Sequence, residues 1–183
     1  MSFSKLDRDR IVREGVALLR AEGLDAVSLR RIAARLGVSV SSLYWHVADK
    51  GTLYALMSGA IFQSCVAAIP PTRNWRQWLH EFGLALWDAQ IAIPDARQLI
   101  VVARPKLELA RPMLERIVAT LESLGLPAAH AMVAQRSVQA LVTGWTTLRA
   151  ARPDAVAADR ESFVVALDVL VEGWEARLAR EGQ

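Results

Sequence analysis

The feature that most constrains the fold is a pair of short helical segments separated by a glycine, in the stretch "SLRRIAARLGVSVSSLYWHV". Ser28 is a favourable N-cap for a helix over residues 29–36, and Gly37 follows at the position where a left-handed residue ends a helix. Ser39 can cap a second, shorter helix over residues 40–46. Two helices joined by a glycine-containing turn within about 20 residues have the plan of a helix-turn-helix.

The rest of the chain also has helical periodicity, and no convincing alternating strand appears in it. Asp7 can cap a first helix ending near Glu22, and Asn74 can cap another. The expected helices after the helix-turn-helix cover residues 50–67, 75–90, 94–103, 112–124 or from a turn earlier, 127–150 and 161–179. The sequence therefore predicts an all-α fold of about nine helices. We expect a helix-turn-helix domain over residues 1–49 and a ligand-binding and dimerisation domain over residues 50–183.

Charge and composition narrow the class of protein. The net charge of +3 lies entirely in residues 1–57, whereas residues 58–183 are neutral overall, and a basic N-terminal third is compatible with phosphate binding. The single cysteine, Cys65, excludes an internal disulfide framework. The N-terminus has no apolar signal core, which indicates a cytoplasmic protein. The uncharged stretch 51–72 contains polar residues and ends in two prolines, so we interpret it as a buried helix rather than a membrane span.

The second helix of the pair has the chemistry that base reading requires. A reading helix places its N-terminal residues at base edges in the major groove, so these residues are small or polar. An arginine in the preceding helix can reach a guanine. Aromatic, histidine and lysine side chains after the reading helix can meet phosphates. Taken singly, each residue has a simpler interpretation as packing or as a solvated helix end. The candidate DNA-binding residues are Arg30, Val40, Ser41, Ser42, Tyr44, Trp45, His46 and Lys50.

The stretch "SLRRIAARLGVSVSSLYWHVADKGTLY" resembles the DNA-binding domain of the tetracycline-repressor (TetR) family. The resemblance implies that Arg30 and the start of the reading helix face bases, and that Tyr44, His46 and Lys50 face phosphates with Trp45 beside them. Val40 and Ser41 stand where the tetracycline-responsive branch has Gln and Pro, so a different operator is expected. The family habit is a homodimeric repressor that a small molecule releases from double-stranded DNA.

A weaker resemblance to the family's effector domain continues through "NWRQWLHEFGLAL" and "FVVALDVLVEGWEARL". The chain is shorter than the tetracycline branch near residues 150–160, so one helix before the last is expected to be absent or rudimentary. The positions that hold magnesium in that branch fall on Ile100, Ala140 and Leu148, which offer no metal ligands. We therefore expect no metal and no cofactor, and a lipophilic effector rather than a tetracycline–magnesium chelate.

Two interpretations of the apolar C-terminal residues remain open at this stage. They either line a cavity for a small lipophilic molecule, with one arginine as its polar handle, or fill a helical core. The candidate ligand-binding residues are Phe82, Leu86, Ile100, Arg104, Met113, Ile117, Leu141 and Trp145.

Nine of the twelve residues in the stretch 163–174 are apolar, more than a helix buried on one side needs. This surplus predicts a dimer interface formed with helix 127–150. The candidate interface residues are Val138, Leu141, Val142, Val165 and Val169. The leading hypothesis is a ligand-responsive repressor, and the alternative is a DNA-binding regulator without a small-molecule ligand. An enzyme is not expected, because His46, His80 and His130 lie on separate helices and no catalytic or metal spacing appears.

Overall fold

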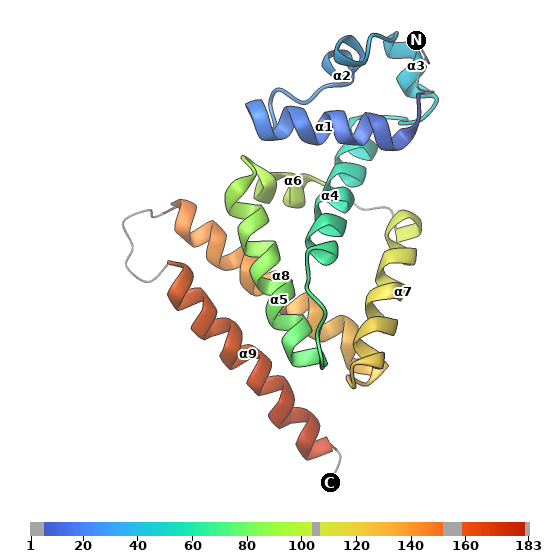
Figure 1. The fold of residues 1–183 in the computed structure, drawn as a ribbon. Helices are drawn as coiled ribbons and strands as arrows, with labels where there is room; N and C mark the ends of the chain where they lie inside the picture. The colour runs from blue at the N-terminus through green and yellow to red at the C-terminus, as the bar shows by residue number, and fades with distance from the viewer. Residues whose placement is uncertain (1–5, 104–106, 152–158, 182–183) are drawn as a thin grey trace. The chain divides into compact units, whose positions relative to one another are not determined.

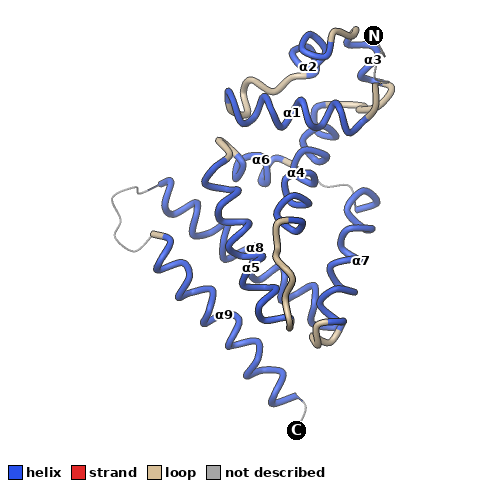
Figure 2. The backbone as a smooth tube through the Cα atoms, viewed as in Figure 1, coloured by secondary structure: helices blue, strands red, loops and turns tan. Residues whose placement is uncertain are grey.

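The computed structural model describes residues 6–103, 107–151 and 159–181, and these ranges are helical without any strand (Figures 1 and 2). The predicted all-α fold is therefore confirmed. The helices within these ranges are α1 (Arg8–Glu22), α2 (Leu29–Leu36), α3 (Val40–Tyr44), α4 (Lys50–Ala67), α5 (Trp75–Ala92), α6 (Ala96–Val102), α7 (Leu107–Ser123), α8 (Ala128–Ala151) and α9 (Arg160–Glu181). The expected loss of a helix near residues 150–160 falls mostly outside the described residues.

The N-terminal helices begin and end at the predicted capping residues. The side chain of Asp7 accepts the N–H of Arg10 at 2.7 Å, and Ser28 caps α2 in the same way. Gly37 has φ 67, a left-handed conformation that glycine adopts without a steric penalty. Helix α3 ends at Tyr44, two residues earlier than expected, because the next N–H groups turn back to the carbonyl of Leu43.

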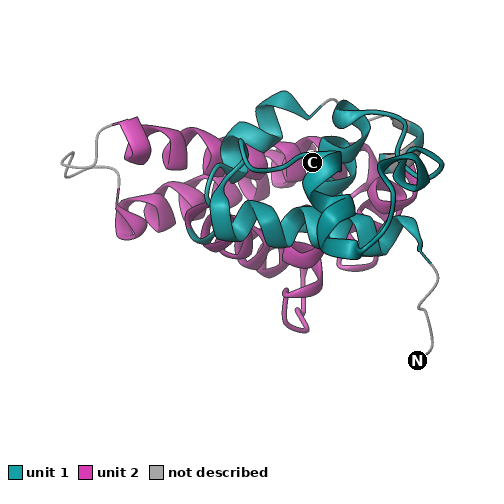
Figure 3. Ribbon diagram, turned by 90° about the horizontal axis from the view of Figure 1, so that it is seen from above, with its two compact units in different colours: residues 1–63, 92–110 teal, residues 64–91, 111–183 magenta. Residues whose placement is uncertain are grey.

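The chain divides into two compact units (Figure 3). Unit 1 comprises residues 1–63 and 92–110, and unit 2 comprises residues 64–91 and 111–183. Helices α1, α2, α3 and α6 and most of α4 therefore belong to unit 1, whereas α8, α9 and most of α5 and α7 belong to unit 2. The domain boundary expected after residue 49 stays a prediction.

The core of unit 1 joins the three N-terminal helices to α4. Its fully buried side chains come from all four helices and the loop before α4, and they include Ile11, Leu18, Leu19, Ile32, Leu43, Val47, Leu53 and Met57. A side chain at Gly15 would meet the Met57 sulfur at 2.9 Å, so this glycine lets α4 approach α1 closely. Burial of this apolar set fixes the orientation of α2 and α3.

The core of unit 2 is built around α5, α8 and α9. The Trp87 ring stacks on the Phe163 ring with centroids 4.4 Å apart, which fastens α9 to α5. A Cβ at Gly83 would lie 2.7 Å from Leu167, so the two helices pack closely there. A buried polar pair lies in this core, where the Thr146 hydroxyl donates to the Gln90 side-chain oxygen at 2.6 Å.

No single helix of the described ranges has the length and apolar character needed to cross a membrane. A bent pair, residues 110–123 with 128–151, meets the test of length and composition when taken together.

Candidate nucleic-acid interface

The start of α3 is shaped by a serine network. The Ser39 hydroxyl accepts the N–H of Ser42 at 3.2 Å and lies 2.8 Å from the Ser42 hydroxyl. Ser42 is thereby engaged in capping its own helix, whereas Ser41 is exposed and Val40 is half-buried. Because Leu43 anchors the helix from below, its first turn presents small side chains outward. A helix surface of this kind can approach base edges closely.

The three arginines of α2 differ in their surroundings. Arg31 donates two hydrogen bonds to the Glu22 carboxylate at 2.7 and 2.8 Å, and Arg35 forms an ion pair with Glu14. Arg30 is exposed, and the structure records no such partner for it among the described residues. Among the arginines of α2, its guanidinium is therefore the one without a recorded ion pair in the described part of the chain, and its contact with a base stays a prediction.

The aromatic pair that follows the reading helix lies on the surface. Tyr44 is 53% exposed and Trp45 is 89% exposed, because Leu43 and Val47 take the buried positions on either side. His46 is half-buried. An indole left almost fully in water loses the burial energy that tryptophan usually gains, so this position is better explained by a partner than by packing.

Lys50 is the first residue of α4, where its ammonium opposes the helix dipole. The neighbouring Asp49 carboxylate offsets this effect by accepting the N–H of Thr52 at 2.6 Å. The Lys50 ammonium lies 5.2 Å from the centre of the Tyr54 ring. The lysine is exposed, so it can reach a phosphate. The contacts of all eight candidate residues with DNA stay predictions.

Arg8 is a residue that the sequence did not single out. Its Nε donates to the carbonyl oxygen of His46 at 3.3 Å, which joins the start of α1 to the loop after α3. Thirty-eight residues separate the two partners. Local sequence patterns extend over a few residues, so none of them could have predicted this contact.

The candidate ligand-binding residues do not all belong to one unit. Ile100 lies in unit 1, the remainder of the described set lies in unit 2, and Arg104 lies outside the described residues. Phe82, Leu86 and Ile117 are fully buried, and the Phe82 ring stacks on Trp78 with centroids 5.4 Å apart. The other members, Met113, Leu141 and Trp145, are half-buried.

A groove of about 520 Å³ opens in unit 2 at the start of α5 and the end of α9. Polar side chains pair across it, since Arg76 binds Glu175 and the His130 Nε2 lies 2.9 Å from the Glu181 carboxylate. Trp75, Pro127 and Leu178 supply apolar lining. No candidate ligand-binding residue lines this groove. The described residues hold no group of three His, Cys, Asp or Glu that could bind a metal.

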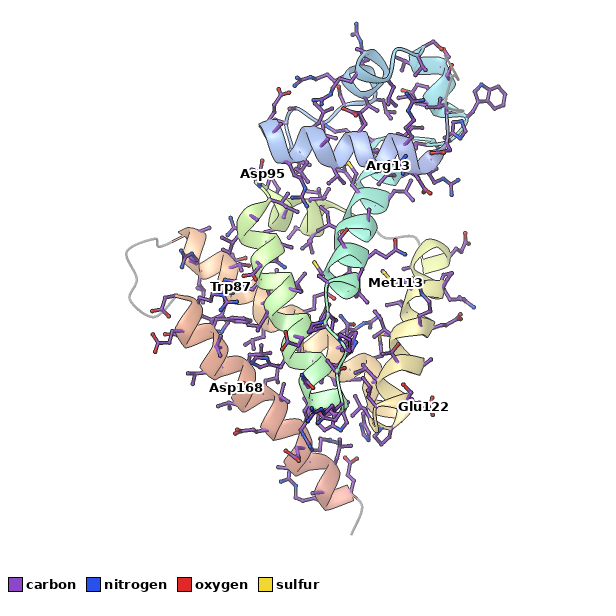
Figure 4. The ribbon with its side chains drawn as sticks, viewed as in Figure 1. Arg13, Trp87, Asp95, Met113, Glu122 and Asp168 are labelled. Carbon is purple, nitrogen blue, oxygen red and sulfur yellow. The ribbon has the colours of Figure 1, made fainter. Side chains whose placement is uncertain are left out.

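The candidate dimer residues separate into buried and exposed groups. Val138 and Val142 are fully buried inside unit 2, so their expected place at an interface is corrected to a place in the core of the protomer. Leu141 is half-buried. Val165 and Val169 are 60% and 62% exposed, as their spacing on the outer side of α9 predicted. Figure 4 shows Asp168 on the same helix, and α9 contacts α8.

Residues 11–57 match the family model described as bacterial regulatory proteins, tetR family. The tetracycline repressor protein class E of Escherichia coli is 34% identical over 85 residues, which are 45% of this chain and 40% of that repressor. The chain thus spans less than half the length of this curated relative.

Solved structures resemble the chain over nearly its whole length. A TetR variant from Acinetobacter baumannii AYE in complex with minocycline is 27% identical, with a TM-score of 0.75, and the match covers 94% of this chain and 98% of that one. BioQ of Mycobacterium smegmatis is 28% identical, with a TM-score of 0.67, and the match covers 94% and 99% of the two chains.

Proposed function

Because residues 11–57 match the model of the tetR family of bacterial regulatory proteins, we propose that the chain is a tetR-family transcriptional repressor that binds a palindromic DNA operator as a homodimer in the cytoplasm. A small lipophilic effector releases it from the operator. The observation that carries the proposal is the surface of α2, α3 and the residue that follows α3, where Arg30, Ser41 and Trp45 are exposed and none is buried in the core.

The polarity of this surface supports DNA as the partner. Its arginine and lysine carry charge that complements phosphates, and its serines offer both donors and acceptors to base edges. Two such heads on a dimer contact half-sites about 34–36 Å apart, or a multiple of that distance. The operator is therefore expected to be palindromic.

The dimer is supported by α8 and α9. Val165 and Val169 on α9, and Val133 and Leu148 on α8, are large apolar side chains that a protomer by itself leaves in water. Burial of each such side chain contributes about 1.5–3 kcal/mol. A second copy that brings the same two helices forms a four-helix interface across a two-fold axis.

The effector is supported by the TetR complex with minocycline and by the apolar interior of unit 2, in which Met113, Leu141 and Trp145 are half-buried. The alternative function is regulation of DNA without a small-molecule ligand. The complete burial of Phe82, Leu86 and Ile117 favours this alternative, because side chains that already fill a core leave less space for a ligand. A screen for small molecules that release the protein from its operator separates the two functions.

The test of DNA binding starts from selection of an operator from random duplex DNA by the parent protein. Lys50→Ala is expected to weaken binding to all sequences and to lower the salt slope by about one unit, because a phosphate contact is lost. Arg30→Ala is expected to relax the preference at one base pair, at a cost of about 1–3 kcal/mol. Arg31→Ala is the matched control, since Glu22 already holds that guanidinium.

Two results would overturn the proposal. The first is a parent protein that selects no sequence. The second is a pair of variants, Lys50→Ala and Arg30→Ala, that both bind the selected operator as tightly as the parent does.

A further inference from the structure

We propose that Arg8 is an additional DNA-backbone contact of the head and that it positions the loop after the reading helix. This inference rests on the proposed function. It starts from the hydrogen bond between the Arg8 Nε and the carbonyl oxygen of His46, at 3.3 Å.

The His46 carbonyl lies just beyond the C-terminal end of α3. The backbone turns there, since the N–H groups of His46 and Val47 both bond to the Leu43 carbonyl at 2.9 Å. The carbonyl end of a helix carries partial negative charge, so a guanidinium beside it is favourable. Arg8 thus ties the start of α1 to the segment that carries the exposed Tyr44 and Trp45.

The bond to His46 occupies a small part of what the guanidinium offers. Arginine has five N–H donors in a fixed planar fork, and the bond through Nε leaves the four donors on the two Nη atoms. The structure records no other partner for them among the described residues, and Arg8 is exposed. A carbonyl oxygen carries only partial charge and leaves the cation without a full counter-charge.

A phosphodiester supplies the missing counter-charge. Guanidinium and phosphate pair through parallel N–H···O bonds, and such charge-assisted bonds are stronger than bonds between neutral groups. Because Arg8 is joined to the loop that follows Tyr44 and leads to Lys50, a phosphate near those residues lies within reach of the same loop. Arg8 then acts in two ways, by holding the loop through Nε and by binding the DNA backbone through Nη.

Arg13 provides a matched control on the same helix. It is also an exposed arginine, and its position five residues further on places it about 140° around α1 from Arg8. Loss of either residue removes one positive charge from the head. A general effect of net charge would therefore weaken DNA binding equally in the Arg8 and Arg13 variants. Loss of a contact made by Arg8 would weaken it only in the Arg8 variant.

The experiment measures binding of the full-length protein to its selected operator by fluorescence anisotropy at several KCl concentrations. Arg8→Ala is expected to lower the salt slope by about 0.9 and the affinity about three- to tenfold, for operator and unrelated duplex alike. Arg8→Lys is expected to keep the slope, because the charge remains, but to bind more weakly than the parent, because an ammonium lacks the fork. Arg13→Ala is expected to match the parent.

A second readout needs no DNA. Amide hydrogen exchange in residues 45–49 is expected to be faster in Arg8→Ala than in the parent or in Arg13→Ala, with thermal midpoints of all three alike. An unchanged salt slope in Arg8→Ala, with the parent bound specifically, would overturn the backbone contact, and unchanged exchange would overturn the positioning role. A parent without operator binding would instead overturn the proposed function, and the exchange result would still decide the positioning role.

Discussion

The carboxylate of Asp95 accepts the backbone N–H of Leu24 at 2.9 Å, which joins the start of α6 to the loop after α1 within unit 1 (Figure 4). Asp95 is the N-cap residue of α6, yet its side chain makes no capping bond to its own helix. Among the described residues, Asp95 is the non-glycine residue with a positive φ, which is 56. Gly23 leaves room for the contact, because a Cβ there would lie 2.7 Å from the Asp95 carboxylate.

Replacement of Asp95 tests how much this contact stabilises unit 1. Asp95→Ala removes the acceptor of a partly buried N–H and keeps the left-handed backbone, so the free energy of unfolding is expected to fall by about 2 kcal/mol. Asp95→Asn retains a carbonyl acceptor and tolerates that backbone, so it is expected to stay within about 0.5 kcal/mol of the parent. Denaturant unfolding measures both changes.

Asp95→Gly separates the two causes, since glycine relieves the backbone strain but offers no acceptor. The free energy of unfolding of this glycine variant is expected to lie between those of the alanine and asparagine variants. An alanine variant as stable as the asparagine variant would show that the bond contributes nothing.

The dimer proposal predicts that charge on the outer side of α9 dissociates the protein. Val165→Asp or Val169→Asp would bury an unpaired carboxylate against a second copy, so monomers are expected in sedimentation at micromolar concentration. Operator binding is expected to be lost with the dimer, because one head makes too few contacts. Val101→Asp is the matched control, since Val101 is an even more exposed valine, on α6 in unit 1. A monomeric parent, or dissociation by the control, would refute the interface.

The effector proposal predicts operator release and a raised melting temperature with members of a panel of planar lipophilic compounds, which should include tetracycline with magnesium. Leu141→Ala is expected to weaken the effective compound about tenfold, because apolar contact with the ligand is lost. Leu178→Ala removes a similarly half-buried leucine that lines the groove at the end of α9. Ligand binding affected by Leu178 but not by Leu141 would place the ligand in the groove.

Two other outcomes of this screen would be informative. Release by tetracycline that requires magnesium would overturn the lipophilic assignment. A Trp145→Ala variant that responds to every compound as the parent does would remove that residue from the site, and absence of any response would favour regulation without a ligand.

The stability of the start of α9 is expected to depend on pH. The backbone N–H of Ser162 donates to Asp159 at 2.8 Å, and this bond, together with the Ser162 side chain and nearby Arg149, lowers the pKa of Asp159 below its ordinary value of 3.8. A lowered pKa in the folded protein means that the stabilisation is complete above the unfolded value and is lost as the pH falls through the folded value. NMR titration of the Asp159 carboxyl is expected to give a midpoint below 3.8.

Ser162→Ala is the control for this cap, because it removes the side-chain hydrogen bond and keeps the backbone one. Its Asp159 midpoint is expected to lie between that of the parent and 3.8. A midpoint at or above 3.8 in the parent would contradict the cap.

Much of the fold could be predicted because helix ends are local events. Asp7, Ser28 and Ser39 cap the helices that follow them, and Gly37 adopts the left-handed conformation that its position indicated. The outward position of Val165 and Val169 on α9 was also predicted, and both side chains are exposed. Capping bonds span three residues and a helix turn spans about four, so all the interacting partners lie close together in the sequence.

The tertiary structure decided everything that depends on partners distant in the sequence. The sequence indicated Arg30 as a base-reading residue, but the ion pairs that engage Arg31 and Arg35 became visible only in the folded chain. Val138 and Val142 are apolar, as interface residues often are. They lie in the core instead, because α5 and α9 pack against that side of α8. Local propensity determined where the helices begin and end. Burial determined which of their faces remain exposed to a partner, because burial depends on contacts between residues far apart in the chain.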